Sequence, residues 1–173
     1  MRTRILVATT LAIAGVAVVA AQTPQQQQPP QQPQQAQQRG PASSALNYVP
    51  GIGDLMNTLV QPRHAKLGLA AHERNWELAA YALKELDQAF STVAKVQPKF
   101  RNLTVSEMIE SMTGESMRGL DDAIRARDPK KFAAAYGDLT DGCNSCHTAL
   151  NHAFVVIKTP DASSFPNQEF KAP

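Results

Sequence analysis

Apolar residues recur every three or four positions along most of the chain after about Leu46, whereas strict alternation never lasts more than a few residues. A recurrence near 3.6 residues places apolar side chains on one face of a helix. The pattern predicts four helices, and their start points are near Gly53, Asn75, Thr104 and Asp128.

Capping residues and prolines set the ends of these predicted helices. Asn75 is a suitable N-cap for the second helix, which stops before Pro98. Thr104-Val-Ser-Glu107 has the spacing of a capping box, and Asp128 is a cap followed by proline at the first helical position. Pro62 falls inside the first helix, about Gly53 to His72, and is expected to kink it or to leave one backbone hydrogen bond unmade.

The connections between the predicted helices are short, around Glu73, Arg101 and Arg127. Short connections favour antiparallel neighbours, so the expected fold class is all-α, an antiparallel four-helix bundle. This bundle domain is expected over residues 46–157, followed by an irregular C-terminal tail over residues 158–173.

The N-terminal part has a different composition. Arg2 and Arg4 precede an uncharged apolar stretch, Ile5–Ala21, that ends in small residues, and this is typical of a secretory signal peptide over residues 1–21. The alternative is a retained membrane anchor, since 17 apolar residues are near the lower limit for spanning a bilayer. Residues 22–45 are predicted to be a disordered Gln/Pro-rich linker, because Gln22–Gln38 contains 11 Gln and no large apolar side chain.

Charge excludes one class of function. The chain has 17 Lys and Arg against 15 Asp and Glu, and without Arg2 and Arg4 the two counts are equal. A nucleic-acid binder held by bulk positive charge is therefore not expected. The chain has 2 cysteines, Cys143 and Cys146, which lie three residues apart. A disulfide between residues so close would not stabilise a fold, so a chemical role is expected for them.

The sequence Cys143-Asn-Ser-Cys146-His147 matches the C-x-x-C-H pattern of covalent haem attachment. The two thiols form thioethers with the haem vinyl groups, and the adjacent imidazole is the proximal iron ligand. On a helix these three residues share the face that carries the inward apolar stripe, so one haem c is expected inside the bundle. Gly142 leaves room for the macrocycle or marks a helix irregularity.

Three other interpretations of the cysteines are weaker. A Cys143–Cys146 disulfide would close a trivial loop and stabilise little. A thioredoxin-like redox pair belongs in a βαβ unit, which the pattern does not predict. A zinc site that adds His147 and His152 has the right ligand types but a poor tetrahedron, because His152 lies about 140° around the helix from His147.

A four-helix bundle with C-x-x-C-H on its last helix resembles the class II cytochromes c, that is, cytochrome c prime and its low-spin relatives. The resemblance covers roughly residues 51–154. It implies that Cys143 and Cys146 are thioether anchors and that His147 is the proximal ligand. This chain departs from the family after the histidine, where an aromatic and a basic residue are usual, and in its long tail.

The resemblance also implies that the distal side of the haem faces the N-terminal part of the first helix. Met56 is the residue at that place, and His64, about 12 Å further along the helix, is a less favoured distal ligand unless Pro62 turns it inward. An open, apolar distal face is the third option.

These features predict a periplasmic monohaem cytochrome c that carries single electrons between redox partner proteins, as a monomer or a homodimer. A membrane is involved only if the signal segment is retained. The alternative function is a five-coordinate haem protein that binds or senses small gases such as NO or CO. An enzyme is not expected, because the first helix offers no obvious acid-base pair beside the iron.

Overall fold

The computed structural model of the protein describes residues 48–173, which are helical apart from one short hairpin and irregular connections. The helices are α1 (Ile52–Leu55), the π-helical η1 (Met56–Val60), α2 (Gln61–His72), α3 (Trp76–Val96), α4 (Val105–Arg125) and α5 (Pro129–Ala149). This confirms the predicted all-α class. The predicted signal peptide and linker, residues 1–45, lie outside the described residues, and no helix within residues 48–173 is long and apolar enough to cross a membrane.

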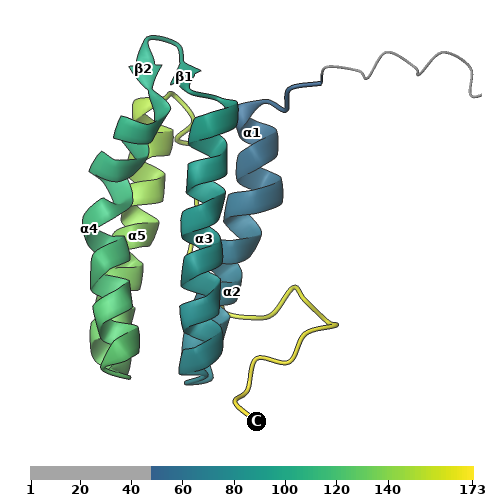
Figure 1. Ribbon diagram of the computed structural model, residues 1–173, viewed down its shortest axis with the longest axis vertical. Coiled ribbons are helices and arrows are strands. Elements are labelled where there is room, and N and C mark those ends of the chain that lie inside the picture. Colours follow the sequence, from purple (N-terminus) through teal and green to yellow (C-terminus); the bar gives the residue numbers. More distant parts are fainter. Residues whose placement is uncertain (1–47) are drawn as a thin grey trace, which may run out of the picture. The chain divides into compact units, whose positions relative to one another are not determined.

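The long helices lie side by side, with α2 packed on α3, α3 on α4 and α4 on α5 (Figure 1). Three tight turns connect them, each with an arginine in the left-handed region: Arg74 at φ 55°, Arg101 at φ 53° and Arg127 at φ 51°. The start of α1, the hairpin and the end of α5 all lie at the top of Figure 1. Ile52 at the start of α1 and Leu150 at the end of α5 line one cavity there.

The first predicted helix is not a single α-helix with a kink at Pro62. It is α1, η1 and α2 in succession, and the N–H of Gln61 donates to the carbonyl of Met56, five residues back. Pro62 follows in the first turn of α2. A proline ring clashes with the carbonyl four residues earlier, and the wider π turn that precedes it relieves this clash. The irregularity therefore falls on Met56–Val60 rather than on the proline itself.

Two of the three predicted N-caps are confirmed. The side chain of Asn75 accepts from the N–H of Leu78, and that of Asp128 accepts from the N–H groups of Lys130 and Lys131. The predicted capping box at Thr104 is wrong, because Thr104 caps α4 without a side-chain hydrogen bond to the helix. Its hydroxyl accepts instead from Nζ of Lys99, 2.8 Å away, across the hairpin.

That hairpin was not predicted. It consists of β1 (Lys99–Phe100) and β2 (Leu103–Thr104), which pair antiparallel with Phe100 opposite Leu103. Strands of two residues are too short to produce an alternating pattern in the sequence.

The core is built from aliphatic side chains on the inward stripes of all the long helices. The largest fully buried side chains are Leu67, Leu86, Leu120, Leu139, Val93 and Val105. Rings extend this core in a row, with Trp76 edge-on to Phe132 and Phe132 stacked on Tyr136.

After α5 the chain is irregular, and its last residues pack against α2 and α3. Phe170 is buried in the core cluster, and Nδ2 of Asn75 donates to the carbonyls of Phe170 and Lys171 at 3.2 Å. The N-cap of α3 therefore also holds the C-terminal tail.

Candidate functional site

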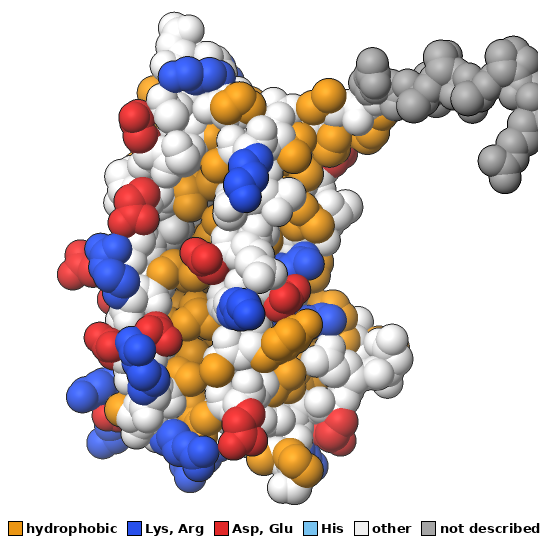
Figure 2. Space-filling model, in the orientation of Figure 1, with side chains coloured by type: hydrophobic (Ala, Val, Ile, Leu, Met, Phe, Trp, Pro, Cys, Tyr) orange, Lys and Arg blue, Asp and Glu red, His pale blue; other side chains and the backbone are white. Residues whose placement is uncertain are grey.

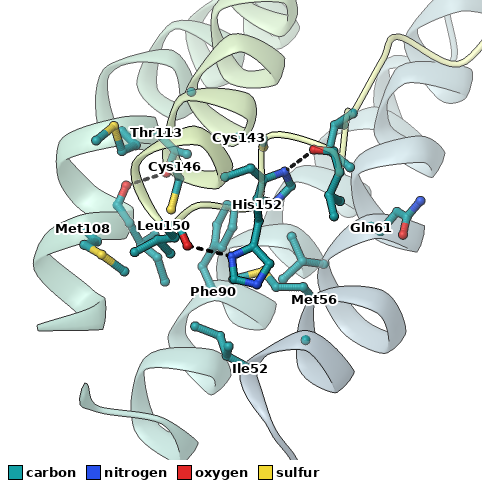
Figure 3. Close-up of a pocket in the computed structure, with 18 of the residues that line it drawn as sticks. Ile52, Met56, Gln61, Phe90, Met108, Thr113, Cys143, Cys146, Leu150 and His152 are labelled. Carbon is teal, nitrogen blue, oxygen red and sulfur yellow. Dashed lines mark hydrogen bonds between the residues drawn. The ribbon is translucent and has the colours of Figure 1, made fainter. Parts of the chain in front are cut away.

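A cavity of about 240 Å³ lies between the end of α5 and the segment formed by α1 and η1. Voids in a packed core rarely hold more than a water molecule, so this end of the protein is not closed by its own side chains. Helices α3 and α4 complete the walls, which are mostly apolar, with Phe90, Val105, Met108, Ile109 and Met112. Figure 3 shows Cys146 and Leu150 on one side of this space and Ile52 and Met56 on the other.

The motif residues Cys143, Cys146 and His147 all line this cavity. They fall in the last two turns of α5, at offsets of three and four residues that put them on one helix face. Both cysteines are free thiols and are only partly exposed. The structure thus brings the three predicted attachment residues to one apolar space.

Burial controls the protonation of the two thiols. It raises the pKa of Cys143 to about 11, with a smaller contribution from Cys146, and it also raises the pKa of Cys146. Reactive redox cysteines need the opposite, a lowered pKa, which helix N-termini or nearby cations supply. These thiols lie at the C-terminal end of a helix, so the arrangement does not favour a thioredoxin-like pair.

His147 has a fixed ring orientation. Its Nδ1 lies 2.8 Å from the carbonyl oxygen of Val155. A carbonyl only accepts, so in the neutral ring Nδ1 carries the proton and Nε2 has the lone pair. Histidines that bind metals characteristically donate their second ring N–H in this way, which selects the tautomer and makes the ligand more basic.

The segment Leu150–Ile157 is the part of the site that sequence reasoning missed. Asn151, at φ 63°, reverses the chain after α5, and His152, Val155 and Ile157 then line the cavity. The zinc interpretation treated His152 as a residue of the motif helix, but α5 ends at Ala149. The run of apolar residues over 153–157 was the available signal that this segment packs against something.

Met56 is the first residue of η1 and lines the cavity from the side opposite α5. It is partly buried against the core cluster. Segments of π-helix are rare and occur frequently at functional sites. The predicted distal residue therefore lies at the irregularity of the first helix, across the cavity from the motif.

His64 also lines the cavity, but both of its ring nitrogens are hydrogen-bonded. Nε2 lies 3.0 Å from Oγ1 of Thr140, and Nδ1 lies 3.0 Å from the hydroxyl of Tyr136. Thr140 donates its own proton to the carbonyl of Tyr136, so it accepts from Nε2. Burial lowers the pKa of His64 to about 4, which keeps the ring neutral. The Tyr136 hydroxyl also donates to the backbone carbonyl of His64 at 2.8 Å. Both ring nitrogens therefore face side chains of α5 in this arrangement, which makes His64 a weaker candidate for an iron ligand than Met56.

Gly142 has a packing role in addition to the expected ones. A Cβ at this position would overlap the carbonyl oxygen of Met112 on α4. The glycine therefore lets the backbones of α4 and α5 approach closely, one residue before the first cysteine. Gly142 also lines the cavity.

A metal site made by the protein alone has no support within residues 48–173. No group of three or more His, Cys, Asp or Glu side chains in that range is arranged to hold an ion. The zinc interpretation, which needs Cys143, Cys146, His147 and His152 around one point, is therefore not favoured. His147 and His152 each have Nδ1 on a backbone carbonyl, of Val155 and of Leu150, and each has an Nε2 that is free among the described residues. A histidine of this kind suits a cofactor that brings most of the metal's ligands itself.

Comparison with protein-family models, with curated proteins and with solved structures gives no match for this chain.

Proposed function

We propose that the protein is a periplasmic monohaem cytochrome c that transfers single electrons, built as an antiparallel four-helix bundle with haem c attached to its last helix. The observation that carries the proposal is that Cys143, Cys146 and His147 line the same apolar cavity as Met56. The hydrogen bond from Nδ1 of His147 to Val155 supports it further, because it leaves Nε2 available as a ligand.

The chain's own residues would divide the work. Cys143 and Cys146 would hold the haem as thioethers, and His147 would be the proximal ligand from the same helix. Bound haem supplies an iron that changes oxidation state by one electron. Met56 would bind from the opposite side, and its thioether sulfur would stabilise the reduced state and raise the reduction potential.

The surroundings of the cavity suit electron transfer more than catalysis. Apolar walls from α3, α4 and η1 exclude water, and burial is one of the means by which a protein sets a haem potential. Two histidines besides His147 line the cavity: both ring nitrogens of His64 lie within hydrogen-bonding distance of side chains, and Nδ1 of His152 lies 2.9 Å from the carbonyl of Leu150. No side chain is therefore assigned a substrate role.

Redox partners would dock by local features rather than by net charge. Phe154 and Val156 are 81% and 72% exposed in the segment that follows the motif helix. On the face drawn in Figure 2, Lys and Arg are interspersed with Asp and Glu, so no single sign dominates that view. Small, weak contacts of mixed character are typical of electron-transfer encounters.

The attachment experiment uses the chain expressed in a bacterial host that exports it and attaches haem. Wild-type protein is expected to retain haem after denaturation, and the variant C143A/C146A is expected to retain none. His147→Ala is expected to keep the covalent haem and to change its optical spectrum strongly. A His147→Ala spectrum equal to that of the wild type would contradict the proximal assignment. Haem that can be extracted from the denatured wild-type protein would contradict the thioethers.

A second candidate function, binding of NO or CO at five-coordinate iron, is favoured by the apolar residues beside Met56, among them Ile52, Val60 and Ile109. Carbon monoxide added to the reduced protein separates the two. Slow binding that depends on ligand displacement, and becomes fast in Met56→Ala, supports the electron carrier. Fast binding in wild type, with a high-spin spectrum, supports the gas binder.

A further inference from the structure

The side chain of Asn144, inside the C-x-x-C-H motif, pairs with both backbone groups of Ile157. Nδ2 of Asn144 donates to the carbonyl of Ile157 at 2.9 Å, and the N–H of Ile157 donates to Oδ1 of Asn144 at 2.8 Å. The amide thus bonds the backbone as a neighbouring strand would, and it fastens the segment after α5 to the helix that carries the motif.

Between these two residues the chain makes a compact loop, Leu150–Ile157. It begins with the left-handed turn at Asn151, continues with the N–H of His152 donating to the carbonyl of His147 at 2.7 Å, and then with the N–H of Val155 donating to the carbonyl of His152 at 2.8 Å. Each of these bonds is local. The Asn144 amide is the side chain that ties the far end of the loop back to the helix.

Val155 lies two residues before the point that Asn144 holds, and its carbonyl accepts the Nδ1–H of His147. If Ile157 moved, the carbonyl that selects the tautomer and orientation of the imidazole would move with it. We infer that Asn144 is a positioning residue for the proximal ligand, acting through Ile157 and Val155. The inference rests on the proposed haem attachment. It gives a specific role to Asn144, a position of the motif that would form no bond to haem itself.

A hydrogen bond from the distant ring nitrogen to a carbonyl raises the basicity of the ligating nitrogen. A more basic ligand stabilises the oxidised iron, so the bond holds the reduction potential down. Loss of the Asn144 amide is therefore expected to move the potential to a more positive value and to expose the Nδ1–H of His147 to solvent.

Ser145 gives a matched control. It is the other variable residue of the motif, and its side chain is exposed. Haem-loaded wild type, Asn144→Ala and Ser145→Ala are compared by redox titration and by NMR exchange of the His147 Nδ1–H in the reduced state. Thermal unfolding checks that all three are folded.

The expected result is a more positive potential and faster Nδ1–H exchange in Asn144→Ala, with Ser145→Ala equal to wild type. Equal potentials and equal exchange in the two variants would overturn the inference while leaving haem attachment intact. Wild-type protein without covalent haem would overturn the proposed function and the inference together.

A second pair of variants covers the case in which Asn144→Ala does not accumulate with haem. Asn144→Asp keeps the acceptor for the Ile157 N–H but replaces the donor by an oxygen that repels the Ile157 carbonyl. Ser145→Asp adds the same charge one residue away. A more positive potential in Asn144→Asp than in Ser145→Asp supports the positioning role, and equal potentials contradict it.

Discussion

The two ends of the helical domain are built from the same kind of apolar stripe but are packed differently. At the closed end, where α2 turns into α3 and α4 into α5, Leu67, Ala70, Ala79, Leu120 and Ala123 are fully buried. At the open end the stripe continues as Ile52, Met56, Met108, Ile109 and Met112, and these residues line a cavity of about 240 Å³.

The irregular features of the backbone gather at the open end. The π turn of η1 follows Ile52, the close approach at Gly142 precedes the motif, and the loop fastened by Asn144 follows it. With regular helices alone, we expect the apolar side chains of neighbouring helices to pack directly against one another, as they do at the closed end. The proposed haem site would account for this difference, because the open end would then pack around the cofactor.

Truncating one apolar side chain at each end tests the difference in packing between them. These variants have the largest expected effects on stability. Leu120→Ala, at the closed end, is expected to cost about 2–5 kcal/mol because it leaves a hole in a packed core. Met108→Ala, at the open end, is expected to cost less than half of that in the haem-free variant C143A/C146A, and more once haem is attached. Urea unfolding of both forms measures the costs.

The control within this experiment is Leu120→Ala itself, whose cost is expected to be the same with and without haem. A Met108→Ala cost that does not change on haem attachment would contradict the assignment of the cavity to the cofactor.

His64 sits where the closed end meets the cavity, and its pKa gives the second prediction. Burial lowers this pKa from 6.5 to about 4. Above pH 6.5 the ring is neutral in the folded and the unfolded state, whereas between pH 6.5 and 4 only the unfolded state takes up the proton. Wild type is therefore expected to lose about 3 kcal/mol over that interval relative to His64→Gln.

The measurement is the free energy of unfolding as a function of pH for both proteins. Parallel curves for the two proteins would show that burial does not hold His64 neutral in the folded state.

Two glycines of α5 give the smallest expected effects, with opposite signs. Gly142→Ala would force the helix backbones apart, because its Cβ would meet the Met112 carbonyl, and is expected to cost about 1–3 kcal/mol. At Gly137 a Cβ meets no atom within 4 Å, so Gly137→Ala is expected to stabilise the helix by about 0.5–1 kcal/mol. Thermal unfolding compares them, and equal effects at the two positions would contradict the close approach of α4 and α5.

The sequence predicted the parts of the fold that depend on local chemistry. The periodic stripes, the caps at Asn75 and Asp128 and the turns between helices are all encoded within a few residues, and the structure has them. The motif and Met56 were identified from spacing and from a resemblance, and the structure brings them to one cavity.

What escaped prediction depends on contacts between residues distant in sequence or on backbone detail. The hydroxyl of Thr104 does not cap α4, because it accepts a hydrogen bond from Nζ of Lys99 across the hairpin. The partner of His147 is a backbone carbonyl, which has no signature in sequence, and it is presented by a loop whose course depends on the turn at Asn151 and the amide of Asn144. The π turn likewise arises from the response of the backbone to Pro62 and is not read from periodicity.

The central claim is that the cavity at the end of α5 holds a haem bound through Cys143, Cys146 and His147. The most direct test is the intact mass of the exported wild-type protein under denaturing conditions, together with its optical spectra in both redox states. We expect one haem per chain that survives denaturation, no titratable thiol and a reversible change between the oxidised and reduced spectra. A protein with two free thiols and no haem absorbance would contradict it.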